Sequence, residues 1–340
     1  MQIQHTSLLK KTGIIALLPL FLFLSGCTTI YDTAGLGMVV YGKDRMLPYF
    51  LSTDDPEVAC TMGEAMSPVI GSFGSVTDEF GSLLGLASGM CADMKAKEAE
   101  LRNLRAMRLN LPSEARDART QQKRYLALAA KRLHAGYLAT VRVHGEPGES
   151  CPVFSSEASE LFWIMGLIDG MQALVADIAS GTSIGVPLSI VPKIQRSMNC
   201  LDNEKWWGLP EGIEALTMIL LPGDPPAGVD PEKNLQHAVD IGNQQGVRMV
   251  QMLQATLYAG NGDYERVKRI IKDHVKSKSE VAPIRSLRFL DEVATLQIRL
   301  ISDIMWTKAT GERTPYGKLG VFWDDKPSMD SSALDIDDLL

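Results

Sequence analysis

The pentapeptide GTSIG at residues 181–185 matches Gly-x-Ser-x-Gly, which presents a serine nucleophile in many hydrolases. In those enzymes the serine lies on a sharp turn between a strand and a helix. Here the preceding segment, Leu161 to Ala179, is long and reads as a helix. The context therefore predicts a loop between helices, and nothing in the sequence places His237 or His274 near Ser183 as a base. We do not expect an enzyme.

The histidines show no metal-ligating spacing. The five histidines include no pair four residues apart and no His-Glu-x-x-His motif, and no cysteines form a Cys-x-x-Cys pair. We therefore expect neither a metal site nor a cofactor. The formal net charge of −7 lacks the basic footprint that nucleic-acid binding requires.

Cysteines offer a different chemistry, the formation of disulfides. Four of the five cysteines, Cys60, Cys91, Cys151 and Cys200, follow the N-terminal region. An even number of cysteines in an exported chain is compatible with disulfides, and three pairings are possible. We favour Cys60–Cys91 and Cys151–Cys200, because each pair is nearest in sequence and would tie adjacent helices. Buried free thiols are the alternative.

The segment from Leu161 to Ile178 is apolar nearly all round, which predicts a buried central helix. Asp169 lies in the middle of it, and a buried carboxyl must be paired, hydrogen-bonded or neutral. One reading is a helix-end contact or a structural pair with an arginine. The other is that Asp169 and Trp163 face a ligand cavity. The adjacent Trp206 and Trp207 leave the same choice between packing and ligand binding.

The N-terminal segment reads as an export signal. A positive start at Lys10 and Lys11 precedes an apolar run, Ile14 to Leu24, that is too short to span a membrane. The run ends in Leu-Ser-Gly-Cys, which resembles the lipobox of bacterial lipoproteins. This resemblance implies cleavage before Cys27 and acylation of that residue. The absence of Asp at Thr28 implies an outer-membrane location facing the periplasm.

Helical signals dominate the rest of the chain. Asp-Pro-Glu occurs at 55–57 and 230–232, where Asp can cap a helix and Pro can begin it. The segment from Ala255 to Val275 predicts a helix, a Gly-Asn-Gly turn and a second helix capped by Asp263. It resembles a tetratricopeptide (TPR) hairpin. Glycines at 81, 85 and 89 predict close helix packing. We expect an all-α array of antiparallel helix pairs, TPR-like with divergent repeats.

These patterns divide the chain into four parts. Residues 1–26 are interpreted as a lipoprotein signal peptide and 27–45 as a lipidated linker. Residues 46–308 are expected to form the TPR-like domain. Residues 309–340 are rich in Asp, Pro and Ser and predict an acidic, largely extended or disordered tail. Val321-Phe322-Trp323 within this tail could dock on the body or on a partner.

The order of several segments between Leu47 and Trp306 resembles the T-component (TatT) family of TRAP transporters, periplasmic lipoproteins of tripartite solute uptake. Asn234 departs from the family pattern, which has a small residue there, and the acidic tail has no counterpart. The segments that carry the resemblance are Met46–Phe50, Leu83–Met90, Leu161–Trp163, Val191–Ile194, Cys200–Asp202, Gly228–Lys233 and Leu253–Tyr264.

This resemblance implies an accessory protein without enzyme activity that can trimerise. It also implies a ligand-accessible cleft and docking to a periplasmic solute-binding protein. An apolar or amphipathic small ligand would suit the Trp- and Met-rich composition. The alternative is a helical-repeat scaffold lipoprotein in envelope or outer-membrane assembly, which would use the same fold without a ligand.

Overall fold

The computed structural model describes residues 29–220, 223 and 225–326, and all regular structure in these residues is helical. The all-α prediction is therefore confirmed. The predicted signal peptide, Cys27 and tail residues 327–340 lie outside the described residues. The α-helices are α2 (Leu47–Leu51), α3 (Pro56–Gly71), α4 (Gly81–Arg108), α5 (Pro112–His144), α6 (Glu157–Ser180), α7 (Ile190–Ser197), α8 (Leu209–Leu220), α9 (Pro231–Gln245), α10 (Met249–Gly260), α11 (Tyr264–Glu280) and α12 (Arg288–Thr310). Short π- or 3₁₀-helical turns are η1 (Gly42–Met46), η2 (Gly74–Phe80), η3 (Met198–Cys200) and η4 (Arg285–Leu287).

Three helices begin where the sequence predicted their caps. The Asp55 carboxylate accepts the Glu57 N–H at 3.0 Å at the start of α3. Asp230 caps α9 in the same way, and Asp263 caps α11 after the glycine-containing turn from α10. These carboxylates satisfy N–H groups that have no partner within the helix and favour the positive end of its dipole.

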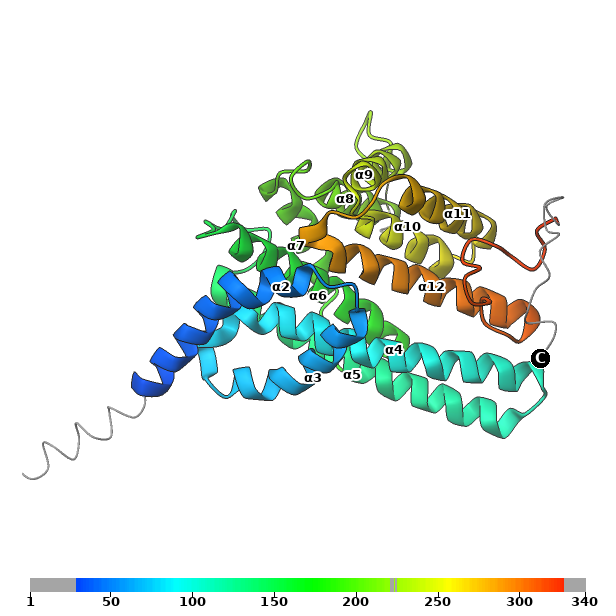
Figure 1. Ribbon diagram of the computed structural model, residues 1–340, viewed down its shortest axis with the longest axis horizontal. Helices are drawn as coiled ribbons and strands as arrows, with labels where there is room; N and C mark the ends of the chain where they lie inside the picture. Colours follow the sequence, from blue (N-terminus) through cyan, green and yellow to red (C-terminus); the bar gives the residue numbers. More distant parts are fainter. Residues whose placement is uncertain (1–28, 221–222, 224, 327–340) are drawn as a thin grey trace, which may run out of the picture.

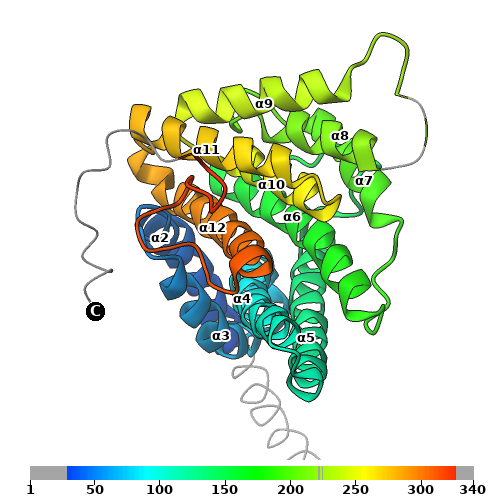
Figure 2. The same ribbon diagram turned by 90° about the vertical axis from the view of Figure 1, so that its right-hand side faces the viewer.

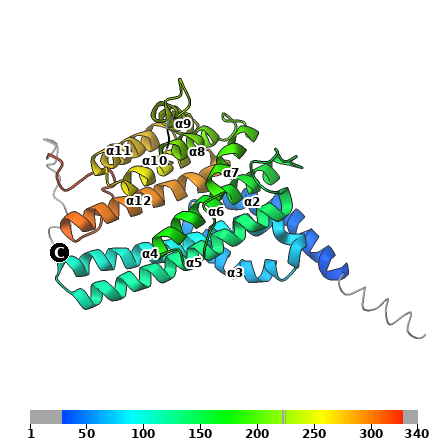
Figure 3. The same ribbon diagram turned by 180° about the vertical axis from the view of Figure 1, so that it is seen from behind.

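The helices form two connected layers. The long helices α4 and α5 lie antiparallel along the molecule, and α6 packs against both (Figures 1 and 3). On the other side of α4 runs α12, followed by α10 and α11, while α8 and α9 complete the outer edge (Figure 2). The structure is thus an array of packed helices, in which α4 joins the N-terminal half to the C-terminal half.

The central helix of the first half is α6, as its all-round apolar sequence predicted. It is long and apolar enough to cross a membrane by length and composition, and 78% of its most apolar window is buried inside this fold. Phe162, Leu167 and Ala173 are all at most 1% exposed. Burial by α4, α5 and α7 accounts for this composition without a bilayer.

Small residues allow α4 and α5 to approach closely. A Cβ on Gly81 would lie 2.2 Å from the Ala139 Cβ, and a Cβ on Gly89 would lie 2.5 Å from Leu133 Cγ. A side chain at Gly81 would require the helices to move, and one at Gly89 would require the Leu133 side chain to shift. The glycines at spacing four, predicted as a close-packing face, do lie at a helix–helix contact.

A buried ion pair holds the C-terminal helices together. Arg248 and Asp291 have no exposed side-chain surface, and Arg248 Nη1 donates to Asp291 Oδ1 at 2.8 Å. The same guanidinium donates to Ser277 Oγ and to the Ser277 carbonyl at the end of α11. Burial, with the nearby positive charges of Arg248 and Lys278, lowers the pKa of His274 to about 3. The network joins α10, α11 and α12; Asp291 Oδ2 accepts no hydrogen bond among the described residues and has Lys278 Nζ at 3.8 Å as its ion-pair partner.

Two terminal segments differ from the sequence-based domain scheme. The described part of the predicted linker, residues 29–45, is helical and continues into α2. Residues 309 and 310 belong to α12, and residues 311–326 lie on the body without regular structure. There Phe322 is 2% exposed, and Lys268 pairs with Asp324 at 2.6 Å. The tryptophan-containing motif of the tail therefore docks on the body, through apolar burial and ion pairs.

Candidate functional site

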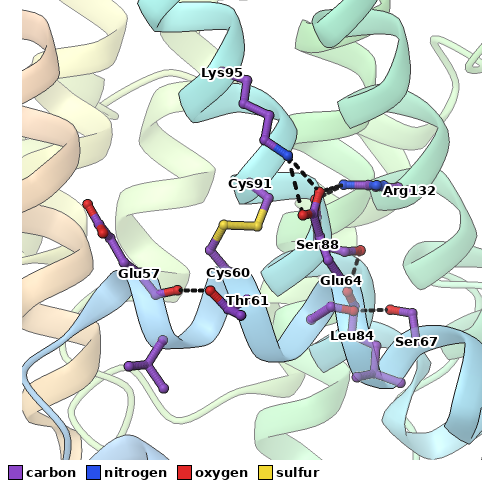
Figure 4. The surroundings of a disulfide bond; sticks show 12 residues. Glu57, Cys60, Thr61, Glu64, Ser67, Leu84, Ser88, Cys91, Lys95 and Arg132 are labelled. Carbon is purple, nitrogen blue, oxygen red and sulfur yellow. Dashed lines mark hydrogen bonds and ion pairs between the residues drawn. A yellow bond between two sulfur atoms is a disulfide. The ribbon is translucent and has the colours of Figure 1, made fainter.

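The structure joins the cysteines in the pairs that were favoured from the sequence. Cys60 of α3 is bonded to Cys91 of α4, and Cys151 is bonded to Cys200 of η3. The first disulfide fixes α3 against the α4–α5 hairpin (Figure 4). The alternative of free thiols is wrong for this structure.

The predicted serine motif is a loop that closes off α6. Ser183 shares a hydrogen bond of 2.9 Å with Ser180, whereas His237 contacts Glu211 and His274 contacts Gln251 and Thr295. Neither histidine is bonded to Ser183.

The loop after α6 is instead organised by Asp177. Its carboxylate accepts the backbone N–H groups of residues 184, 185 and 186, each at 2.8 Å. Burial would raise the pKa of Asp177, but these N–H groups outweigh burial and lower it. The pentapeptide is therefore a carboxylate-stabilised turn between α6 and α7, as its helical context predicted.

The tryptophans proposed as ligand contacts are core residues. Trp163, Trp206 and Trp207 are 1%, 2% and 4% exposed, and none lines the groove described below. Trp206 Nε1 donates to Glu160 Oε1 at 2.8 Å, and the rings of Trp206 and Trp207 meet edge to face. These tryptophans pack in the core of the described residues, where burial stabilises large aromatic surfaces, and their ligand role stays a prediction.

A groove of about 500 Å³ opens elsewhere, between α3, η2, α4 and α5. Much of its wall consists of glycines and small hydroxyl residues, with apolar contributions from Ile70, Leu84 and Ala139. Two arginines of α5, Arg132 and Arg142, also line the groove. The lining residues are Ser67, Ile70, Gly71, Gly74, Ser75, Thr77, Asp78, Gly81, Leu84, Gly85, Ser88, Arg132, Ala135, Gly136, Ala139 and Arg142.

Both arginines of the groove are oriented by carboxylates. Arg142 forms two hydrogen bonds with Asp78, at 2.7 and 2.8 Å, and these hydrogen bonds raise the pKa of Arg142. Arg132 donates to Glu64 at 2.7 Å and to the Ser88 carbonyl at 2.8 Å. The two parallel hydrogen bonds between Arg142 and Asp78 fix the plane of the Arg142 guanidinium.

The Arg132 end of the groove lies beside the first disulfide. Figure 4 shows Glu64 between Lys95 and Arg132, close to Cys60–Cys91. The hydrogen bond from Arg132 is the main cause that lowers the pKa of Glu64. The disulfide holds α3, which carries Glu64, against α4, and so fixes the carboxylate that orients Arg132.

Asp169 of α6 lies directly behind the glycine part of the groove. Its Oδ2 is 3.0 Å from the place where a Cβ on Gly85 would lie, and 2.2 Å from that place on Gly136. Both glycines line the groove, so only two backbone segments stand between the groove and the carboxyl. Absence of side chains at these two positions is what lets three helices meet there.

The Asp169 carboxyl is fully buried, and neither oxygen has a hydrogen-bond partner among the described residues. Burial raises the pKa of Asp169 well above its usual value, which favours the protonated, neutral form. The expected pair with an arginine is absent from the described residues. A neutral carboxyl beneath glycines can donate one hydrogen bond and accept others.

The arrangement offers the groups that a ligand-binding groove needs. Apolar walls can cover a hydrocarbon part of a ligand, hydroxyl oxygens can accept hydrogen bonds, and the arginines can meet an acidic group. Among the described residues, no three His, Cys, Asp or Glu side chains are grouped to hold a metal ion. Two features singled out in the sequence lie at this groove: the glycines Gly81 and Gly85 of α4, which line it, and Asp169, which lies behind it.

No protein-family model, no curated protein and no solved structure matches this chain.

Proposed function

We propose that the protein is a lipid-anchored periplasmic accessory of a TRAP-type solute uptake system. It holds a small amphipathic ligand in the groove between α3, η2, α4 and α5, and it docks a periplasmic solute-binding protein. In this proposal Cys27 carries the lipid that anchors the body to the outer membrane. The fold is TPR-like, with α10 and α11 as its most regular hairpin, and homotrimers form as the resemblance implies.

The observation that carries this proposal is the groove backed by Asp169. A buried, unpartnered carboxyl is costly, and a strongly perturbed titratable group beside a groove is a candidate for a functional site. Gly85 and Gly136 bring this carboxyl close to a groove that also presents oriented arginines. An amphipathic molecule with an acidic or amide group matches that combination of apolar and polar walls.

Ligand binding is tested on protein purified from membranes. Native mass spectrometry detects a bound molecule, and the molecule is then extracted and identified. Ala135 is exposed and lines the groove, so Ala135→Trp fills it without disturbing the core. Leu138 is exposed on the same helix but does not line the groove, and Leu138→Trp is the matched control. We expect the bound molecule to be lost from Ala135→Trp and kept by Leu138→Trp.

Equal retention by both variants, or no bound molecule in the wild type, would contradict ligand binding in this groove.

A pull-down from periplasm is expected to recover a solute-binding protein. Recovery of outer-membrane assembly factors alone would favour the scaffold function instead. Lipidation is tested by labelled palmitate, which the wild type should incorporate and Cys27→Ala should not.

We propose no enzymatic activity for this protein. Ser183 is held by Ser180 in the loop after α6 rather than by a histidine. A fluorophosphonate probe is therefore expected to leave Ser183 unmodified. Labelling that disappears in Ser183→Ala would contradict this.

A further inference from the structure

The first helix of the described chain, residues 29–41, exposes an unusually apolar face. Ten of its residues are exposed, and Asp32 is the only charged one among them. Monomeric proteins seldom leave large neighbouring apolar side chains uncovered. The large apolar side chains that this helix exposes, with their exposed fractions, are Ile30 (68%), Tyr31 (64%), Leu36 (55%), Val40 (59%) and Tyr41 (63%); all but Tyr31 lie on one face by helix periodicity.

The opposite face of this helix is fixed against the body. Gly35 and Gly42 approach η2 so closely that a Cβ would lie 2.7 Å from Val76 and 2.0 Å from Phe80. Val39 lies between them on the same stripe and is 8% exposed. Contacts at positions i, i+4 and i+7 lock the rotation of the helix. The apolar face therefore points outward as a consequence of packing.

The position of the helix favours a bilayer as the occupant of this face. Thr29 follows Cys27 by two residues, and a 13-residue helix is about 20 Å long, so the whole face lies near the proposed lipid. The helix occupies one end of the molecule, and the turn between α4 and α5 occupies the other (Figure 1).

The chemistry of the face also matches the interfacial region of a membrane. Tyr31, Tyr41 and the exposed Tyr49 of α2 have the amphipathic rings that concentrate at membrane interfaces. Arg45, one turn after Tyr41, is exposed and makes no ion pair with the described residues. Its guanidinium suits a phospholipid phosphate.

We infer that helix 29–41 lies in the headgroup region of the membrane that holds the Cys27 lipid, with Leu36 and Val40 turned toward the acyl chains. The inference rests on the proposed lipidation and goes beyond it, because a lipid on a flexible linker would leave the body free to rotate. Two contacts, the lipid and the helix, orient the body and set the direction in which its groove faces.

The test uses lipidated full-length protein reconstituted in vesicles of phosphatidylethanolamine and phosphatidylglycerol. An environment-sensitive fluorophore is attached at Leu36→Cys or, as control, at Leu109→Cys, an exposed leucine at the opposite end of the molecule. We expect blue-shifted emission at position 36, quenched several-fold more by spin-labelled phospholipid than emission at position 109. Adding Val40→Asp should reduce that quenching.

Mass spectrometry of the N-terminal peptide separates the possible failures. Acylated Cys27 with equal quenching at positions 36 and 109 would overturn the membrane contact alone. A label at position 36 that lipid cannot quench, and whose emission shifts on dilution, would show that a second copy covers the face and would also overturn it. Unacylated Cys27 would refute the lipoprotein assignment, and the inference with it.

Discussion

Replacing Asp169 by Asn is expected to stabilise the protein at neutral pH, although Asp169 has no exposed surface. The two side chains have nearly the same shape, so the packing against Gly85 and Gly136 is kept. Asn cannot ionise, and its NH2 group replaces one carboxyl oxygen, so only the ionisation contribution to the difference in stability depends on pH. Because Asp169 has no hydrogen-bond partner among the described residues, burial raises its pKa without compensation.

The size of the effect depends on pH. An acid whose pKa is higher in the folded protein keeps its proton where the unfolded chain has lost it. The free energy of unfolding of the wild type therefore falls as pH rises above the unfolded pKa of about 4, by about 1.4 kcal/mol per pH unit, until pH reaches the folded pKa. Asp169→Asn lacks this loss, so its advantage over the wild type grows by the same amount over the same interval.

Urea unfolding followed by tryptophan fluorescence between pH 4 and pH 8 measures this difference, with the disulfides kept oxidised. Asp177→Asn on the same helix is the matched control with the opposite sign. The pKa of Asp177 is lowered in the fold, so its charge stabilises the protein above the unfolded pKa, and that contribution disappears as pH falls. A difference between Asp169→Asn and the wild type that does not change with pH would refute the description of Asp169 as a neutral, unpartnered carboxyl.

Three further substitutions test the packing, each by the same unfolding measurement. Gly136→Ala should destabilise by roughly 1–3 kcal/mol, because its methyl group would meet Asp169 Oδ2; unchanged stability would contradict the close approach of α5 and α6. Arg248→Met should cost about 3–5 kcal/mol, because the buried Asp291 charge would keep only the more distant Lys278, at 3.8 Å, as an ion-pair partner. Adding Asp291→Leu should recover much of the loss; an equally unstable double variant would argue against the ion pair as the cause. Removing the disulfide between α3 and α4 by paired alanine substitutions should cost about 4 kcal/mol for its 31-residue separation, and a loss near zero would show that the loop is already restrained in the unfolded chain.

Features with a local physical cause were predictable. Asp55, Asp230 and Asp263 each cap a helix, because a short carboxylate reaches N–H groups two or three residues away. The disulfide pairs were also favoured correctly. Cys60 and Cys91 lie on the neighbouring helices α3 and α4, whereas Cys151, in the connection between α5 and α6, reaches Cys200 of η3.

The candidate site was predicted less well. Trp163 and Trp206 belong to the core, because hydrophobic periodicity cannot distinguish a wall that faces a ligand from one that faces another helix. The same limit applies to the tail: its sequence marked Val321-Phe322-Trp323 as a docking motif but left open whether the body or a partner receives it, and Phe322 is buried on the body. Asp169 stood out correctly as an unusual residue, but its neighbours Gly85 and Gly136 are 51 residues apart in the chain.

By itself, the sequence determined what short-range forces decide: the helical class, the helix starts and the central apolar helix. Only the tertiary structure decided where polar groups meet. It set Arg132 and Arg142 along one groove, placed Asp169 behind the glycines of two other helices, and turned the apolar face of helix 29–41 outward. The physical reason is that helix periodicity fixes which side chains share a face, whereas the partner of each face depends on how all the helices pack together.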